Sequence, residues 1–361
     1  MMIKPHLHLG LNILRSNFGR LSAPYKLTFS ITNKCNMRCK TCSIWRKNSK
    51  DELRLEEIEK FFERFNKFCW VDITGGEPTL RREFLDITKV IVKRCKKLLL
   101  LHFPTNGFLT SRITHMVRKI VRLGVPKLIV SVSLDGPKDL HDEIRGVSGS
   151  WERSLETFRQ LRNIKGVESY LGTTLSRYNA NKYKETLSTV KKILPWVQAR
   201  DFHLNIAHTS FSYDNLHMQE LDARRGSKNV IINEIEKYVK LRGVPFNPVS
   251  FLEHQYLILV KKYLQTGVTP LKCQAFSSSC FISPNGNIYP CSIYNLTIGN
   301  LKDYDYNLER IWNSELGFKV QKEISKYKCP QCWTPCEAYQ SILGNLLFTI
   351  LSTRHRLFIC R

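Results

Sequence analysis

Between residues 26 and 206, short runs rich in β-branched and aromatic residues alternate with longer runs whose apolar residues recur at helical spacing. The alternation repeats six times, and parallel strands joined by helices require right-handed crossovers. This pattern predicts an α/β fold, built as a doubly wound sheet or as a barrel. The predicted strands cover residues 26–32, 70–74, 98–103, 127–134, 167–174 and 201–206.

Helices are predicted between these strands and after them. Residues 207–229 are polar and irregular, which is typical of a loop or linker, and residues 271–336 are rich in turns, with a hairpin predicted at Pro284-Asn285-Gly286-Asn287. Helical spacing of apolar residues places helices within 55–65, 82–95, 111–123, 151–161, 183–194, 230–241, 249–264 and 337–361.

The cysteines form two separate groups. Of the 12 in the chain, three lie within residues 35–42 and six within residues 273–336. The first ten residues contain no long apolar run, so we expect neither a secretory signal nor a membrane-spanning segment. We therefore expect a cytoplasmic protein whose reduced, clustered cysteines bind metal at two sites.

Cys35, Cys39 and Cys42 lie on a short loop directly after the first predicted strand. Three thiolates cannot by themselves complete a four-coordinate structural zinc site. They can hold three irons of a [4Fe–4S] cluster and leave the fourth iron without a protein ligand. The carboxyl ends of the strands are also the edge at which α/β barrels place their active sites.

This Cys-x3-Cys-x2-Cys loop resembles that of the radical S-adenosylmethionine (radical SAM) enzymes. The resemblance implies a partial (β/α)6 TIM-like barrel and a [4Fe–4S] cluster whose open iron binds the amino and carboxylate groups of SAM. It also implies that an electron from the cluster cleaves SAM, and that the 5′-deoxyadenosyl radical formed abstracts hydrogen from a substrate. The electron donor implied is a ferredoxin or a flavodoxin.

Later strand ends strengthen the resemblance. Gly75, Gly76, Glu77 and Pro78 follow the second strand and resemble the family's GGEP motif, which binds the SAM amino group. Glycines let the backbone approach a ligand closely, and a carboxylate suits an ammonium group. An ordinary turn is the alternative interpretation.

The third and fourth strand ends carry further polar residues. Asn106 ends the third strand, while Ser133 and Asp135 end the fourth and are followed by Arg145 in a run that resembles the family's S-x-D-G-P segment. The resemblance implies that Ser133 contacts the SAM ribose and that Arg145 lies near the SAM carboxylate. Asp135 is left open between SAM, substrate and structure. Each residue alone fits an ordinary βα loop; together they predict a binding site.

The late cysteines resemble a SPASM/twitch-type auxiliary iron–sulfur domain. Seventeen residues separate Cys273 from Cys291, and Cys329, Cys332 and Cys336 follow. Six thiolates cannot complete two clusters, so we expect one auxiliary [4Fe–4S] cluster, held by Cys273, Cys291 and two of the other three. The alternatives are a structural zinc and a second cluster that uses Cys360.

The remaining cysteines and the substrate are less constrained. Cys280, Cys69 and Cys95 are interpreted as spare or space-filling thiols. In sulfatase-maturing relatives an Asp that resembles a general base follows the equivalent of Cys291, whereas Ser292 stands here, so that activity is not expected. No catalytic acid or base is assigned, and the substrate is expected to be a peptide, a protein or a small molecule.

The chain is strongly basic, with 56 Lys and Arg against 31 Asp and Glu. No motif resembles an RRM or KH module, so nucleic acid is not the expected partner; a zinc-containing nucleic-acid-binding protein and an RNA-modifying radical SAM enzyme are the alternatives. Both termini place apolar stripes beside arginines, a pattern that also fits contact with the inner membrane surface and a lipid-linked substrate.

The pattern divides the chain into five parts: an N-terminal extension (1–24), the radical SAM barrel (25–206), a linker with helices (207–270), the auxiliary cluster domain (271–336) and a C-terminal amphipathic helix (337–361).

Overall fold

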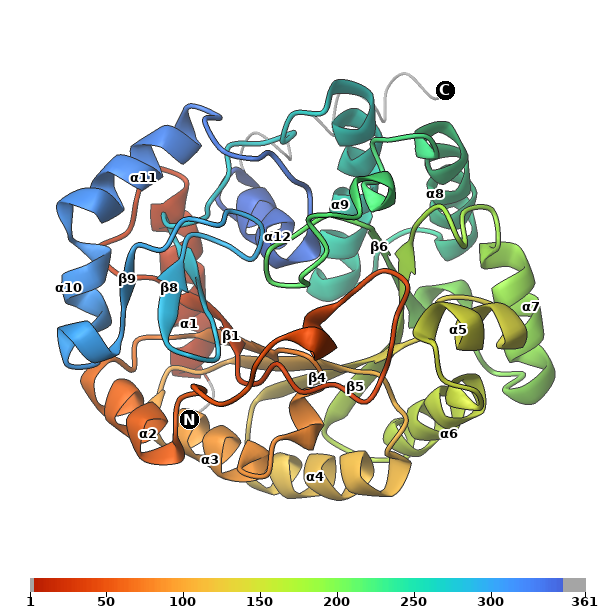
Figure 1. Ribbon diagram of the computed structural model, residues 1–361, viewed down its shortest axis with the longest axis horizontal. Helices are drawn as coiled ribbons and strands as arrows, with labels where there is room; N and C mark the ends of the chain where they lie inside the picture. The colour runs from red at the N-terminus through yellow and green to blue at the C-terminus, as the bar shows by residue number, and fades with distance from the viewer. Residues whose placement is uncertain (1–2, 347–361) are drawn as a thin grey trace.

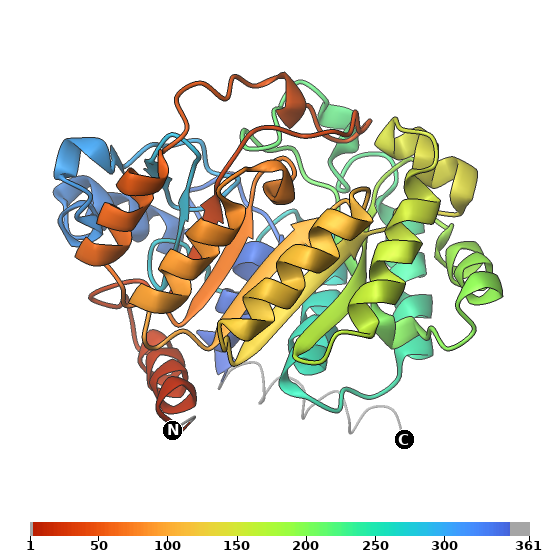
Figure 2. The same cartoon turned by 90° about the horizontal axis from the view of Figure 1, so that it is seen from below.

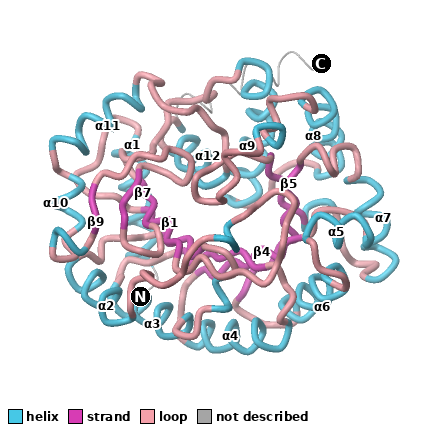
Figure 3. Tube along the Cα trace, in the orientation of Figure 1, coloured by secondary structure: helices cyan, strands magenta, loops and turns pink. Residues whose placement is uncertain are grey.

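A single nine-stranded sheet runs through the protein, whose computed structural model describes residues 3–346. Its strand order is β6-β5-β4-β3-β2-β1-β7-β8-β9, and the first six strands in the chain are all parallel. They curve around an interior while helices cover the outside (Figures 1 and 3), which confirms the predicted partial barrel. The strands are β1 (Lys26–Ser30), β2 (Trp70–Thr74), β3 (Leu100–Thr105), β4 (Lys127–Ser133), β5 (Val167–Leu175) and β6 (Phe202–Ile206).

The crossover helices return along the outer face of the sheet. α2 shows why they form: Glu57 accepts a hydrogen bond from the Arg54 N–H at the helix start, and Phe61 and Phe62 repeat on one face. These two rings pack against Phe29 of β1 in the core. The helices are α2 (Leu55–Arg64), α3 (Phe84–Arg94), α4 (Thr110–Arg122), α5 (Lys138–Arg145), α6 (Ser150–Arg162) and α7 (Tyr183–Ile193).

The cysteine-rich region continues the barrel sheet. β7 (Ser279–Ile282) pairs in parallel with β1, and the predicted hairpin then leads to β8 (Asn287–Tyr289), antiparallel to β7. Gly286 has a φ of 87°, which a side chain would strain, so glycine suits this turn. The remaining elements are β9 (Gly299–Asn300), α8 (Lys228–Arg242), α9 (Pro248–Thr266), α10 (Leu308–Trp312), α11 (Glu315–Ser325) and α12 (Pro335–Leu343).

The N-terminal helix α1 (Ile3–Ser16) packs beneath the start of the sheet. Leu9 and Ile13 contact a small cluster of Leu21, Tyr25 and Cys69, the residues around the beginnings of β1 and β2. Figure 2 shows α1 at the lower edge and the long loop after β1 at the upper edge. Most of the predicted C-terminal helix (347–361) lies outside the described residues, and none of the described helices is long and apolar enough to cross a membrane.

Candidate active site

The loop that carries Cys35, Cys39 and Cys42 is fixed by the C-terminal end of α5. The Arg38 N–H donates to the Arg145 carbonyl (3.0 Å) and the Lys40 N–H to the Ile144 carbonyl (2.8 Å). Gly146 ends α5 with a φ of 66°, and a Cβ there would lie 2.5 Å from the Arg38 carbonyl oxygen. The glycine therefore allows the loop to lie directly against the helix end.

The three thiols lie close enough to influence one another. Burial raises the pKa of Cys35 to about 11 and that of Cys42 to about 12, and the negative charge of neighbouring thiolates adds to both shifts. Burial also raises the pKa of Cys39, against the opposing charge of Arg145, whose Nη1 lies 3.9 Å from the Cys39 sulfur. Three soft donors beside a guanidinium suit an anionic iron–sulfur cluster.

Glycines at the end of β2 receive the cysteine loop. The Gly76 N–H donates to the Thr32 carbonyl (2.9 Å), and a Cβ on Gly76 would lie 2.3 Å from the Lys34 carbonyl oxygen. Gly75 meets the Thr32 backbone equally closely. Gly75 and Gly76 were expected to let the backbone approach SAM. In the structure they let the cysteine loop contact the end of β2.

Glu77 joins the end of β2 to the end of β3. Its carboxylate accepts hydrogen bonds from the Thr79 hydroxyl (2.6 Å), the Thr105 hydroxyl (3.0 Å) and the Asn106 N–H (2.7 Å). Burial raises the pKa of Glu77, and these hydrogen bonds oppose the rise. Pro78 then begins a short 3₁₀ turn. Glu77 lies at the predicted edge of the sheet and holds two strand ends in register.

The other predicted cofactor residues meet at the same edge. The Asn106 amide donates to the Asn36 side chain of the cysteine loop (2.7 Å). Asp135 is buried, and its carboxylate accepts from Arg145 Nη2 (2.7 Å) and from the Thr174 N–H (2.9 Å). Asp135 therefore pairs with the guanidinium that lies beside Cys39. Ser133 ends β4 and is partly exposed.

Four of the late thiols form the second group. Burial raises the pKa of Cys273, with further contributions from Glu337 and then from Cys291 and Cys329. Burial likewise raises the pKa of Cys332, and Cys273 and Cys329 add to that shift. These four thiols come from three segments of the chain.

Cys336, at the start of α12, lies beside the polar residues of β1 and β2. Burial raises its pKa to about 11, Lys26 opposes the rise, and Asp72 and Glu337 add to it. Its carbonyl oxygen accepts a hydrogen bond from the Lys26 ammonium. Cys336 therefore stays a predicted ligand beside the other late cysteines. Cys280 is buried in β7, and Cys360 lies outside the described residues.

A polar network inside the barrel escaped the sequence analysis. Lys26 is fully buried, with its ammonium 3.1 Å from Asp72 and 2.9 Å from the Thr28 hydroxyl. His102 on β3 lies 3.2 Å from Asp72 through Nδ1 and 3.1 Å from the Ser131 hydroxyl through Nε2. The sequence did offer a signal for this network, since Lys26 and Asp72 are charged residues within predicted apolar strands. A charge that is buried in a strand needs a partner.

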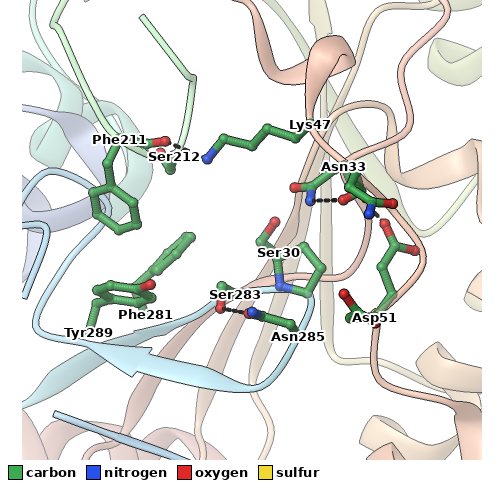
Figure 4. Close-up of a pocket in the computed structure, with 13 residues that line it drawn as sticks. Ser30, Asn33, Lys47, Asp51, Phe211, Ser212, Phe281, Ser283, Asn285 and Tyr289 are labelled. Atoms are coloured by element: carbon green, nitrogen blue, oxygen red, sulfur yellow. Dashed lines mark hydrogen bonds between the residues drawn. The ribbon is translucent and has the colours of Figure 1, made fainter. Parts of the chain in front are cut away.

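A cavity of about 350 Å³ opens between the cysteine loop and the β7–β8 hairpin (Figure 4). The rings of Phe211, Phe281 and Tyr289 gather on one side. Lys47 crosses the upper part of the cavity, and its ammonium donates to the Phe211 carbonyl (2.6 Å). The cavity also reaches Ser30 at the end of β1, so it adjoins the edge where the predicted site residues meet.

Comparison with known families agrees with this arrangement. The model of the radical SAM superfamily matches residues 29–190, and that of an iron–sulfur cluster-binding domain, SPASM, matches residues 273–346. The chain belongs to the radical SAM enzymes that carry a SPASM domain. It accordingly uses a [4Fe–4S] cluster and SAM, with auxiliary iron–sulfur binding in the second domain. The non-enzymatic zinc alternative is therefore abandoned.

Relatives and solved structures cover most of the chain. An AdoMet-dependent heme synthase of Oleidesulfovibrio alaskensis is 24% identical over 337 residues, 88% of this chain and 81% of that protein. The subtilosin biosynthesis protein AlbA of Bacillus subtilis is 26% identical over 335 residues, 88% of this chain and 68% of that protein. Streptococcus suis SuiB bound to its precursor peptide SuiA shares the fold, with a TM-score of 0.59, 14% identity and coverage of 93% and 74%.

Proposed function

We propose that this enzyme abstracts a hydrogen atom from a peptide, which it binds between the barrel rim and the β7–β8 hairpin. The cavity of about 350 Å³ carries the proposal. Three aromatic rings offer an apolar wall, and Asn33, Asn285 and Lys47 offer hydrogen-bonding groups opposite, a combination that suits an apolar side chain flanked by peptide backbone. Names of relatives support a peptide, since AlbA serves a bacteriocin and SuiB binds a precursor peptide.

We propose the following roles for the site residues. Cys35, Cys39 and Cys42 hold the cluster whose open iron, when bound, supplies the electron that cleaves SAM. Arg145, oriented by Asp135, neutralises charge beside the thiolates and lies near the SAM carboxylate. The remaining predicted cofactor-binding residues line the same rim: Gly75, Gly76, Glu77, Pro78, Asn106 and Ser133.

One auxiliary [4Fe–4S] cluster is proposed on Cys273, Cys291, Cys329 and Cys332. Four thiols, one buried and three partly buried, would complete one cubane and leave no open iron. A ferredoxin or flavodoxin in the cytoplasm remains the proposed electron donor. The five-part division of the chain remains a prediction. Contact with a membrane, the other partner proposed from the sequence, depends on a different part of the molecule.

A tetrapyrrole is the second candidate substrate, because heme synthases of similar length are among the relatives. The cavity of about 350 Å³ is small for a whole macrocycle, whereas it accommodates one or two side chains of a peptide. For this reason the peptide is preferred.

Deuterium transfer distinguishes the two candidates. Cells grown in D2O supply a peptide fraction and a porphyrin fraction, and each is incubated anaerobically with enzyme, SAM and dithionite. Hydrogen abstraction from a deuterated substrate places deuterium in 5′-deoxyadenosine, which mass spectrometry detects. We expect label from the peptide fraction only, lost after proteinase treatment of that fraction. Label from porphyrins alone would establish the second candidate.

A further inference from the structure

Helix α1 has two apolar faces, and the protein covers one of them. Leu9 and Ile13 pack on the cluster at the beginnings of β1 and β2. Leu7, Leu11 and Leu14 point the other way and are 59%, 38% and 54% exposed. Their spacing of four and three residues places them in one stripe along the helix. Phe18, in the turn after the helix, is 78% exposed.

Further exposed apolar residues lie at the same edge of the barrel. Val244 and Phe246, in the loop between α8 and α9, are 86% and 68% exposed. Phe246 stacks beneath Arg200, which immediately precedes β6. Because β6 is parallel to β1 and β2, this loop lies at the amino ends of the strands, as α1 does. Single exposed apolar residues are normal on a protein surface. Several exposed apolar residues at one edge of the barrel are instead typical of a surface that binds a partner.

The same edge carries many cations, of which Arg64, Arg94, Arg159 and Arg162 are paired with carboxylates. The crossover helices run antiparallel to the strands, so their last turns lie at the amino ends of the strands. Five of these helices end with cations: Arg64 in α2, Lys93 and Arg94 in α3, Lys119 and Arg122 in α4, Arg159 and Arg162 in α6, and Lys191 and Lys192 in α7. The helix dipole favours such cations and explains part of the pattern. It does not explain why the first acidic residue of the chain is Asp51.

The end of the described chain meets α1 at this edge. The Asn17 amide donates to the Leu343 carbonyl (2.9 Å), and its oxygen accepts from the Leu346 N–H (2.8 Å). The sequence that continues from there, 347–361, contains three arginines, no acidic residue and seven large apolar residues.

We propose that this edge, with α1 at its centre, docks on the surface of an anionic lipid bilayer. Leucines of an amphipathic helix enter the boundary between headgroups and acyl chains, while surrounding Lys and Arg attract anionic headgroups. The bilayer is preferred over a second copy of this chain because residues 5–20, which carry the exposed stripe, contain two arginines and no acidic residue, so two copies of α1 would bring like charges together.

Docking in this orientation turns the catalytic rim toward water. The cysteine loop follows the carboxyl end of β1, opposite the end that α1 contacts (Figure 2). Substrate would then arrive from the aqueous side, which favours a soluble peptide over a lipid embedded in the same bilayer. The docking inference itself stands whatever the substrate is.

Vesicle sedimentation of the anaerobic, iron-loaded full-length enzyme tests the proposal. We expect binding to vesicles of phosphatidylglycerol and phosphatidylcholine, weakened by salt, and little binding to phosphatidylcholine alone. The combined variant Leu7→Ser, Leu11→Ser and Leu14→Ser should lower the partition coefficient by roughly tenfold or more, because three apolar side chains no longer enter the bilayer. Leu216→Ser is the matched control, since this exposed leucine follows β6 at the opposite edge.

The controls make the result decisive. The triple variant must keep its iron content and its reductive SAM cleavage, and Leu14→Ser alone serves if the triple variant does not fold. Equal binding by wild type and variant, or no binding to anionic vesicles, overturns the proposal. A rise in vesicle binding after deletion of 347–361 would show that this segment covers α1. Dimerisation that the variant abolishes, without vesicle binding, would identify a second copy as the occupant.

Discussion

The two cysteine groups are built in opposite ways. Cys35, Cys39 and Cys42 lie within eight residues of one loop, which β1, α5 and the glycines after β2 hold in place. The auxiliary thiols come from three segments that span 60 residues, Cys273 to Cys332, and only the folded hairpin and the start of α12 bring them together. A local site is therefore readable from spacing, whereas a dispersed site depends on tertiary packing.

Removal of one local thiol gives the largest expected effect. Cys39→Ala should abolish reductive cleavage of SAM and lower iron from about eight to about four per chain, because each [4Fe–4S] cluster carries four irons. Iron analysis and chromatography of 5′-deoxyadenosine measure both. Cys69→Ala, a buried thiol in the α1 cluster, is the control and should change neither. Loss of all iron in Cys39→Ala would show that the two sites are not independent.

The dispersed site gives a sharper test, because two neighbouring cysteines should behave differently. If the cluster is held as proposed, Cys332→Ala should lose the auxiliary cluster and about four irons, whereas Cys336→Ala should retain both, since Cys336 is outside the proposed ligand set. Iron content and Mössbauer spectra of the two variants check this. The reverse outcome would return Cys336 to the ligand set and remove Cys332 from it.

The Lys26–Asp72–His102 network inside the barrel should contribute to the free energy of unfolding. Asp72→Asn leaves the fully buried Lys26 ammonium without its carboxylate and should cost about 3–5 kcal/mol of unfolding free energy. Urea unfolding under anaerobic conditions measures it. Adding Lys26→Met to Asp72→Asn should recover part of the loss, because the unpaired charge is gone. Asp86→Asn, in an exposed pair with Lys89, is the control.

The contact between α2 and the SPASM domain should give the smallest effect. Burial opposes the ionisation of Glu57, but hydrogen bonds from the Arg54 N–H, Tyr306 and Lys302 outweigh it and lower its pKa from 4.5 to about 2. Glu57→Gln should cost about 1–2 kcal/mol at neutral pH.

The pH dependence of that cost has a definite sign. A lowered pKa in the folded state stabilises the fold above the ordinary pKa of 4.5, and the stabilisation is lost as the pH falls toward 2. The difference between wild type and Glu57→Gln in unfolding experiments should therefore shrink over this range. A difference that stays constant with pH would assign the effect to packing instead of charge.

Much of the barrel was predictable because its signals are local. β2 has the bounds predicted for it, and β1 and β4 end within two residues of theirs. β3 extends to Thr105, two residues beyond the prediction, because Pro104 interrupts the apolar run without ending the strand. α5 was missed as a helix, since its eight residues are mostly charged and carry little apolar periodicity.

The residues of the candidate site also differ in whether their signal in the sequence is local. Residues at strand ends were predictable, because parallel strands bring their carboxyl ends to one edge. The pairing of Arg145 with Asp135 and the Lys26–Asp72–His102 network were not, because a motif does not show which of its side chains pair, and the network joins three strands distant in sequence. The pairing of β7 with β1, some 250 residues apart, likewise left no local trace.

That pairing limits how the molecule can open. Since β1 hydrogen-bonds to β2 on one side and to β7 on the other, the cysteine-rich region cannot swing away as a hinged lid without breaking a ladder in the middle of the sheet. Entry to the cavity must then come from rearrangement of the loops above the strands, such as those carrying Lys47 and Phe211.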